Sequence, residues 1–334
     1  DKNAFEVSLL VSVMLNAVVP DEVHFMRKNV IDGSNTGGFQ RTGIVGIDGY
    51  LDVSFGRVGI TNISLEEDSA QILGKEDGRT IFGLNRLGIP LVEIGTSPDI
   101  KTPKQAREVA EKIGTMLKST GRVKRGLGTI RQDVNVSIKG GARIEIKGAQ
   151  DLKMIPELVA SEAERQKSLI ALKKEAKKKR LKKQEPKIIN ATGIFTKASS
   201  RIFAGKEAFA IKLSGFSGLF KAPLNSHRAL GREVSNYACA KAGVKGIVHS
   251  DEDIPKYGIE KEFSVLKKKL GAKKEDLIVI VVAPEKTAKT ALNTVVERVN
   301  ILFQGVPEET RRALQSGDAE YMRPLPGAAR MYPE

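Results

Sequence analysis

Four acidic residues in separate segments have side chains suited to holding a metal ion. They are Glu67 in ISLEED, Glu93 in GIPLVEIGTSPDI, Asp133 in RQDVNVSI and Glu145 in ARIEIKG. A basic protein gains little from gathering carboxylates unless a cation binds to them. Mg²⁺ takes oxygen ligands, usually one or two carboxylates together with phosphates and waters. Their pattern alone does not say that the four carboxylates meet, and the hypothesis is that they converge on Mg²⁺ and a nucleotide.

Two of these acids have settings that leave another explanation open. Glu67 belongs to the triplet Glu66-Glu67-Asp68 at the end of a predicted strand, and acidic triplets are usually solvated. Glu93 lies in an apolar segment, so its strand is predicted to be buried. An unpaired buried carboxylate is costly and tends to take up a proton. Glu93 therefore needs a cation, which is either Arg86 nearby or a metal ion.

The third acid lies on a strand that alternates polar and apolar residues. Successive side chains of a strand point to opposite faces. In IRQDVNVSI the polar face carries Asp133, Asn135 and Ser137, with Arg131 at the start of the strand. Acid, amide and hydroxyl groups in a row suit a wet and specific pocket, and the alternative is a solvent-facing edge.

The segment ARIEIKG has the same alternation. Ile144 and Ile146 point to one face, and Arg143, Glu145 and Lys147 point to the other. Glu145 is then placed to ligate a cation and Lys147 to meet a phosphate. A cross-strand ladder of ion pairs explains the same pattern equally well.

Several familiar catalytic motifs are absent. The sequence has no GxxxxGK[ST] loop, which excludes a P-loop ATPase. His24, His227 and His249 are too scattered for a zinc motif. The single cysteine, Cys239, excludes both a disulfide framework and a cysteine zinc site, and this fits a reducing cytosol.

The charge of the chain indicates a polyanionic partner. Its 334 residues carry a net charge of +15 at pH 7, and such an excess most often accompanies nucleic acid binding. The stretch from Lys173 to Lys183 is nearly all basic and lacks aromatic residues, so it suits phosphates and not base stacking. A solvated charged helix is the alternative.

The elements expected around these residues form an α+β fold. The first residues, DKNAFEVSLLVSVMLNAVV, lack the features of a signal peptide and predict a buried helix, and no apolar run is long enough to cross a bilayer. Short strands follow up to about Gly148, with a hairpin over Tyr50–Val58. One helix begins at Pro103, with a capping box of Thr102 and Gln105.

A long helix is predicted from Pro156 to Pro186, and the sequence pattern changes after it. Alternating strands and helices there predict a small α/β domain: strands at Ala208–Leu213, Gly246–Ser250 and Asp276–Ala283, and helices at Ala229–Ala242, Lys261–Leu270 and Pro284–Leu302. The last segment, EYMRPLPGAARMYPE, predicts an ordered loop that returns to the first domain. The predicted domains are residues 1–185, an inserted domain over 186–305, and a return segment over 306–334.

Together these segments resemble the GatB/GatE family of tRNA-dependent amidotransferases. RKNVIDGSNTGGFQRT, ISLEEDSAQIL, LNRLGIPLVEIGTSPDI, GTIRQDVNVSI, RIEIKGAQDL and SEAERQ carry the resemblance. RTGIVGIDGYLDV, VKRGLGTIRQDVNVSI and YMRPLPGAARMYPE point to the archaeal GatE branch. The resemblance covers residues 1–185 and resumes near residue 306. The region between them resembles the insertion domain of bacterial-type aspartyl-tRNA synthetases.

The resemblance implies an activity, a fold and partners. In this family, ATP phosphorylates the γ-carboxylate of Glu-tRNA(Gln), and ammonia then displaces the phosphate to give Gln-tRNA(Gln). The implied enzyme is an ATP-dependent carbon–nitrogen ligase of the cytoplasm. Its ammonia comes from an asparaginase-like partner, the D-type amidotransferase subunit, in a hetero-oligomer of two subunit types. The implied fold is a cradle built on antiparallel sheet.

The resemblance also assigns the site residues. Glu67, Glu93, Asp133 and Glu145 match the family's acidic residues, which hold Mg²⁺ and ATP at the centre of the cradle and serve catalysis. The residues expected to contact the nucleotide are Arg131, Asn135, Ser137 and Lys147.

Two features of the family are not found in this sequence. Family members open with a Gly-Leu-Glu-x-His motif, whose Glu and His belong to the same site, and they continue into helical and tail domains that hold the tRNA. Either the sequence is a fragment of such a protein, or it is the whole molecule and lacks two residues of the site. The alternative function is a non-catalytic module for tRNA binding or assembly, in which the charges serve structure.

Overall fold

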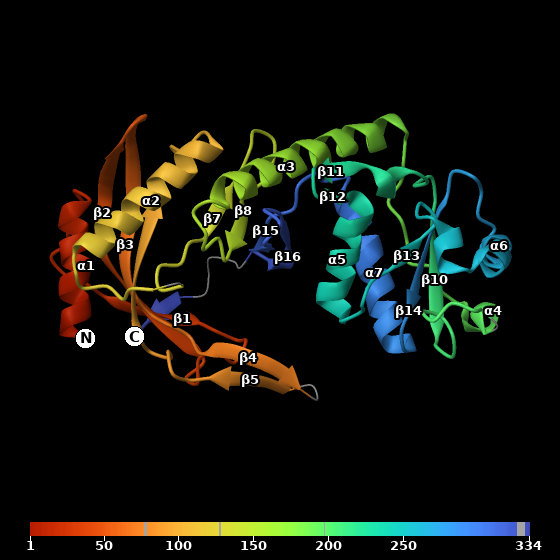
Figure 1. The fold of residues 1–334 in the computed structure, drawn as a ribbon, viewed down its shortest axis with the longest axis horizontal. Helices are drawn as coiled ribbons and strands as arrows, with labels where there is room; N and C mark the ends of the chain where they lie inside the picture. Colours follow the sequence, from red (N-terminus) through yellow and green to blue (C-terminus); the bar gives the residue numbers. More distant parts are fainter. Residues whose placement is uncertain (77–78, 127, 197, 326–330) are drawn as a thin grey trace. The chain divides into compact units, whose positions relative to one another are not determined.

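The computed structural model describes residues 1–76, 79–126, 128–196, 198–325 and 331–334. The chain forms two compact units (Figure 1), one of residues Asp1–Ile130 with Pro326–Glu334 and one of residues Arg131–Leu325. Each unit has a hydrophobic core of its own. None of the helices in the described ranges is long and apolar enough to cross a membrane.

The first unit is built on a five-stranded antiparallel sheet in the order β17-β1-β2-β3-β6. Its elements are α1 (Lys2–Met14), β1 (Phe25–Asn29), β2 (Phe39–Val53), β3 (Gly56–Glu67), β4 (Gln71–Glu76), β5 (Arg79–Gly83), β6 (Pro90–Thr96), α2 (Pro103–Ser119) and β17 (Met331–Pro333). Strands β4 and β5 form a separate two-stranded sheet. Glu67 therefore ends the inner strand β3, and Glu93 lies in the edge strand β6.

Helices α1 and α2 supply the apolar cover of this sheet. Val11 and Val109, one from each helix, belong to the same buried cluster as Ile60 and Ile63 of β3. Helix α1 lies very close to β2, since a Cβ atom at Gly49 would stand 2.5 Å from the backbone oxygen of Leu15. Side chains alternate along a strand, so the residues between those of the core point to the other face.

The second unit contains three sheets, in the orders β16-β15-β8-β7, β13-β14-β10-β9 and β11-β12. Its elements are β7 (Val134–Val136), β8 (Ile144–Lys147), α3 (Ile155–Lys178), β9 (Ile189–Asn190), α4 (Thr192–Phe195), β10 (Ala208–Leu213), η1 (Leu219–Lys221), β11 (Pro223–Asn225), β12 (Arg228–Ala229), α5 (Leu230–Ala242), β13 (Val248–His249), η2 (Ile254–Tyr257), α6 (Glu260–Lys269), β14 (Leu277–Val282), α7 (Glu285–Ile301), β15 (Glu309–Ala313) and β16 (Ala319–Pro324).

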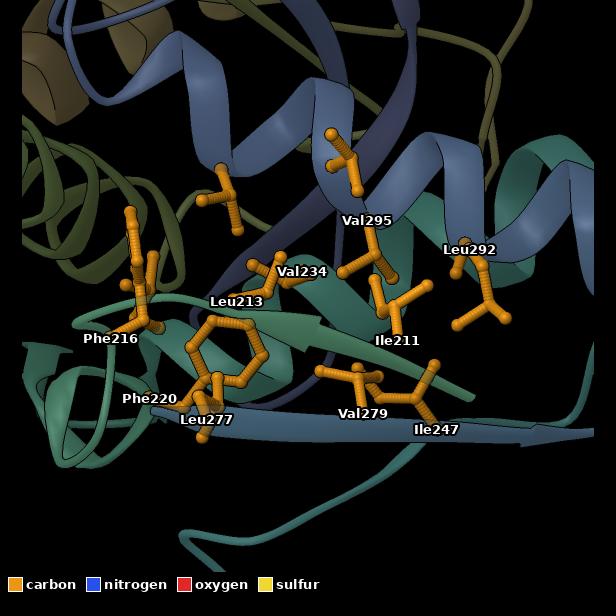
Figure 2. Packing of buried hydrophobic residues seen from close by; sticks show 14 of the residues in the cluster. Ile211, Leu213, Phe216, Phe220, Val234, Ile247, Leu277, Val279, Leu292 and Val295 are labelled. Carbon is orange, nitrogen blue, oxygen red and sulfur yellow. The ribbon is translucent and has the colours of Figure 1, made fainter. Parts of the chain in front are cut away.

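The sheet that contains β10 and β14 is covered on both faces. Figure 2 shows the packing on one face, where side chains of β10, β14 and η1 meet those of α5 and α7. The strands and η1 contribute Ile211, Leu213, Phe220, Leu277 and Val279, and the helices contribute Val234, Leu292 and Val295. The alternate residues of both strands, among them Ala210 and Ile280, join a second cluster with α4 and α6. Burial on both faces explains the unbroken apolar run LIVIVV. The strands of this sheet pair antiparallel.

Strands near the end of the chain pair with strands from earlier parts of it. Strand β15 pairs in parallel with β8, with Thr310 opposite Glu145. Strand β17 pairs with β1 in the first unit. Residues 148–308 therefore lie between two neighbouring strands of one sheet.

The boundaries of the compact units differ from the predicted domain boundaries at 185 and 305. A buried ionic network explains why the chain is compact across both positions. Glu162 and Arg165 of α3, Glu233 of α5, Arg298 of α7, and Glu309 and Arg311 of β15 are each at most 2% exposed. Oε1 of Glu233 lies 2.6 Å from Nη1 of Arg165, and its Oε2 lies 3.0 Å from Nη2 of Arg311. The carboxylate of Glu233 thus bonds to Arg165, which precedes position 185, and to Arg311, which follows position 305.

Most predicted elements agree with the structure, and one helix end is wrong. The capping box of Thr102 and Gln105 is present at the start of α2, and α1, α5, α6 and α7 lie within two residues of their predicted positions or inside them. Helix α3 was predicted to reach Pro186 but ends at Lys178. Arg180 has a φ of 52°, which breaks the helix, and Leu181 then packs against the core.

Candidate functional site

Glu67 lies at the end of β3 in contact with the neighbouring strand. Its carboxylate accepts hydrogen bonds from the backbone N–H of Arg41 and from Nη1 of Arg41, both at 3.2 Å. Arg41 also donates through Nε to Glu334, at 2.8 Å. Glu67 therefore already faces a cation, and its side chain remains 31% exposed.

The adjacent Glu66 is held more completely by the protein. Its carboxylate accepts hydrogen bonds from Lys28 at 3.2 Å, Thr42 at 3.0 Å and Gln40 at 3.3 Å. Its side chain is only 11% exposed. The predicted alternative of a solvated acidic triplet is therefore wrong for Glu66. Of the two glutamates, Glu67 offers the carboxylate that is more accessible to a ligand.

Glu93 is exposed, so the prediction that it is buried was wrong. The apolar residues around it do form a strand, but β6 is the edge of the sheet and its residues are half-buried or exposed. The ladder places Glu93 opposite Ser64. Directly opposed residues share a face, and so do residues two apart along a strand. Glu93 therefore points to the same face as Glu66, whereas Glu67 alternates to the other side.

Arg86, one of the two cations considered for Glu93, contacts Ser69 and Asp68. Nε of Arg86 donates to the backbone oxygen of Ser69 at 2.8 Å and lies 3.8 Å from Oδ2 of Asp68. The third member of the acidic triplet is thus also held within the fold. In the first unit, Glu67 and Glu93 are the more exposed carboxylates of this region.

In the second unit, Asp133 and Glu145 are brought together by Lys147. Nζ of Lys147 lies 2.6 Å from Oδ2 of Asp133 and 3.1 Å from Oε1 of Glu145. Strand pairing places Asn135 directly opposite Glu145. The alternation predicted from the sequence is confirmed, because Ile144 and Ile146 are fully buried and Asp133, Asn135 and Ser137 are exposed. Arg131 is exposed and precedes these strands.

The electrostatics of this group favour the charged forms. Partial burial raises the pKa of Glu145, but the Lys147 ammonium and the Thr310 hydroxyl outweigh it, so the pKa lies below its ordinary value. Burial likewise lowers the pKa of Lys147, but Asp133 and Glu145 outweigh it and raise the pKa above its ordinary value. The carboxylate of Glu145 and the ammonium of Lys147 therefore stay ionised at neutral pH.

Two residues of the return segment complete this face and were not predicted from the sequence. The hydroxyl of Thr310 donates to Oε2 of Glu145 at 2.9 Å. Thr310 also pairs with Arg323 of β16, so Asn135, Glu145, Thr310 and Arg323 form one row across the four strands. Nε of Arg323 is buried and makes no hydrogen bond within the described residues. Arg323 lies in the motif YMRPLPGAARMYPE, which was the signal available in the sequence.

This donor set fits a magnesium ion with a nucleotide. No group of three or more His, Cys, Asp or Glu side chains arranged to hold a metal occurs among the residues that the structure describes. Mg²⁺ does not need one, because it usually takes one or two carboxylates and completes its shell with phosphates and waters. Asp133 and Glu145 already gather a cation, the Lys147 ammonium.

Comparison with known proteins adds a separate line of evidence. The family model for the GatB/GatE catalytic domain matches residues 1–334. It therefore extends through residues 186–305, beyond the segments that carried the resemblance in the sequence.

Curated relatives match over the whole of this chain. The E-type subunit of glutamyl-tRNA(Gln) amidotransferase from Thermococcus gammatolerans is 50% identical, over 100% of this chain and 54% of the relative. The protein of the same name in Methanocaldococcus jannaschii is 48% identical, over 100% and 54%, and that of Sulfurisphaera tokodaii is 46% identical, over 100% and 55%. The chain spans about half the length of the curated relatives it matches. The family predicted from the sequence is thus confirmed, and the chain belongs to the family defined by the GatB/GatE catalytic domain.

Proposed function

We propose that this chain is the catalytic region of an amidotransferase subunit that converts Glu-tRNA(Gln) to Gln-tRNA(Gln). The match of the GatB/GatE catalytic domain to residues 1–334 carries the proposal. The names of the relatives supply the substrate. The chemistry of such a reaction requires a way to activate a carboxylate, which is a poor acceptor for ammonia.

The proposed reaction has two steps. First, an oxygen of the glutamyl γ-carboxylate attacks the γ-phosphorus of ATP, and the bond between that phosphorus and the bridging oxygen of ADP breaks. Ammonia then attacks the carbon of the acyl phosphate, and inorganic phosphate leaves with the C–O bond electrons. The ammonia comes from a partner amidase, for which an asparaginase-like protein, the D-type subunit, is proposed. Catalysis of the first step depends on positioning and on neutralising phosphate charge.

The side chains of the second unit are proposed to position the phosphates. The Lys147 ammonium and the Arg323 guanidinium lie on the same face as Asn135, and two cations with an amide donor suit phosphate oxygens. Arg131 and Ser137 are proposed to contact the same nucleotide. Thr310 holds Glu145 in place through its hydroxyl, because the hydrogen bond fixes one carboxylate oxygen and leaves the other toward Lys147.

Glu67, Glu93, Asp133 and Glu145 are proposed to hold Mg²⁺ with the nucleotide. When bound, the metal ion supplies positive charge that offsets the charge of the transferring phosphoryl group. The accessibility of Glu67, and the cation already gathered by Asp133 and Glu145, support this assignment. The proposed role of Glu93 rests on the resemblance alone, because its side chain points to the face of the sheet opposite to that of Glu67.

The test is an assay of the protein that carries this sequence, purified from its host with its associated subunits. We expect ATP hydrolysis to depend on Glu-charged tRNA(Gln), and the amino acid released from the tRNA to change from Glu to Gln when asparagine or glutamine is supplied. Uncharged tRNA(Gln) is the matched control and is expected to support no conversion. If Glu remains on the tRNA and the rate of ATP hydrolysis does not change when charged tRNA is added, the chain is a non-catalytic module for tRNA binding or assembly.

A further inference from the structure

A groove lined by lysines lies in the second unit, outside the residues assigned to catalysis. Its volume is about 530 Å³. Its lining includes five lysines, one glutamate and only two apolar residues: Lys182, Lys183, Gln184, Glu185, Lys187, Ile189, Lys212, Ser214, Lys269 and Leu270. Small-molecule pockets are mostly apolar with a few polar groups, so this lining is that of an anion site.

The segment that carries three of these lysines is fixed to the body of the unit. Leu181 and Ile188, which flank it, pack against the hydrophobic core. Between them, the backbone N–H of Gln184 donates to Oδ1 of Asn300 at 2.8 Å, and Nδ2 of Asn300 donates back to the oxygen of Gln184 at 2.9 Å. Oε1 of Gln184 accepts from the backbone N–H of Ser214 at 2.7 Å. The lysines on this segment are therefore presented from an ordered strip of backbone.

The other two lysines come from different elements and are also tethered. Nζ of Lys269, at the end of α6, donates to the backbone oxygen of Asn190 at 3.2 Å. Nζ of Lys212, on β10, donates to the backbone oxygen of Gly271 at 3.3 Å and lies 3.8 Å from Asp276. Hydrogen bonds to carbonyl oxygens hold both ammonium groups in position, and Asp276 offsets part of the charge of Lys212. Cations from three parts of the chain therefore line one groove.

The basic surface continues along the chain from the groove. The last turns of α3 precede the groove segment directly and expose Lys173, Lys174, Lys177, Lys178 and Lys179, with Arg180 after them. Nζ of Lys173 donates to the backbone oxygen of Gln304, which holds that side chain against the unit. A run of exposed cations that is longer than one phosphate group suits an extended polyanion.

We propose that this lysine groove, together with the end of α3, binds the phosphate backbone of an RNA strand. The choice of RNA among polyanions rests on the proposed function, whose substrate is a tRNA. The described lining of the groove contains five lysines and no aromatic or arginine side chain, so it has nothing to stack on a base or to hold a guanine edge through two hydrogen bonds. It contacts phosphates without reading sequence, and thereby positions the RNA.

The test compares two double variants of the protein that carries this chain. Lys183→Ala/Lys187→Ala removes two cations from the groove. The control, Lys286→Ala/Lys289→Ala, removes two exposed cations near the start of α7. The control positions are away from the groove, because Asn300, which bonds to the groove segment, lies near the other end of α7. Binding of a fluorescent tRNA transcript is measured by anisotropy between about 50 and 200 mM salt. The groove variant is expected to weaken binding about tenfold at the lower salt and to reduce the slope of log Kd against log salt by about one per lysine.

Each outcome of this comparison decides the question. An unrelated tRNA of the same length is expected to show the same loss, because backbone contacts do not depend on sequence. If the groove variant binds RNA with an unchanged slope, or loses no more than the α7 variant, the groove is not an RNA site. If ATP or inorganic phosphate competes with RNA only when the groove lysines are present, the groove is a site for small phosphates and the proposal is wrong.

The same experiment separates this inference from the proposed function. If the unsubstituted protein converts Glu-tRNA(Gln) but the groove variant binds RNA as well as it does, the proposed function stands and the proposed RNA site in the groove is wrong. If the groove variant loses RNA binding but the unsubstituted protein converts no Glu-tRNA(Gln), the groove is an RNA site and the proposed activity is wrong.

Discussion

Replacing Glu67 by glutamine is expected to reduce ATP hydrolysis stimulated by Glu-tRNA(Gln) by a factor on the order of 10² to 10³. The substitution keeps the size of the side chain and its acceptor oxygen but removes the charge that a metal–nucleotide requires. Arg41 can still donate to the amide oxygen, so the local fold is expected to persist. The measurement is phosphate release in the presence and absence of charged tRNA, and Asp133→Asn is expected to behave alike.

The matched control is Glu22→Gln, which removes a carboxylate that is 80% exposed in the segment before β1. It is expected to leave hydrolysis unchanged. Thermal melting of both variants should match the unsubstituted protein, since Glu67 and Glu22 contribute only exposed or partly exposed ion pairs. A Glu67→Gln protein with normal tRNA-dependent hydrolysis would remove this residue from the site and with it the reason to place a nucleotide there.

The substitution Glu233→Gln is expected to lower the stability of the second unit by about 3–5 kcal/mol. Four arginines surround this buried carboxylate: Arg165, Arg228, Arg298 and Arg311. Burial by itself raises the pKa of Glu233, but the surrounding guanidinium groups outweigh it and hold the pKa well below the usual 4.5. Neutralising the carboxylate leaves these buried cations short of negative charge. Chemical denaturation at neutral pH measures the loss.

The pH dependence has a definite sign. Because the folded pKa of Glu233 is depressed, its contribution to stability is complete above the unfolded pKa and is lost as the pH falls below about 4.5 toward the folded pKa. The difference between the unsubstituted protein and Glu233→Gln should therefore shrink in acid. Glu320→Gln, which breaks a pair with the exposed side chain of Arg312, is the control and should cost under about 1 kcal/mol. A comparable small cost for Glu233→Gln would show that the network does not hold the inserted residues to β15.

Local patterns were enough to predict much of the second-unit site. Alternation placed Asp133 and Asn135 on one face of their strand and Glu145 and Lys147 on one face of theirs. The structure pairs the two strands so that these faces coincide, which the alternation alone did not predict. The pattern did not choose between a cation site and a ladder of ion pairs. The structure contains the ion pairs, and a ladder around a lysine is also an arrangement in which a metal ion can replace the ammonium.

Features that depend on distant pairing could not be predicted. Thr310 reaches Glu145 through the parallel pairing of β8 with β15, which joins residues 165 apart in the sequence. The environment of Glu93 was misjudged because its apolar neighbours indicate a strand but not its position at the edge of a sheet. The early end of α3 depends on the packing of Leu181 against a core formed by later residues.

The most direct test of the central claim is a crystal structure with Mn²⁺ and a non-hydrolysable ATP analogue, using anomalous scattering to locate the metal. We predict Mn²⁺ peaks at coordination distance from carboxylate oxygens among Glu67, Glu93, Asp133 and Glu145, with the phosphates of the analogue facing Lys147 and Arg323. Lys147 is also expected to move away from at least one of its two carboxylates. Nucleotide bound elsewhere, with Arg41 still bonded to Glu67 and Lys147 still bonded to Asp133 and Glu145, would contradict the claim.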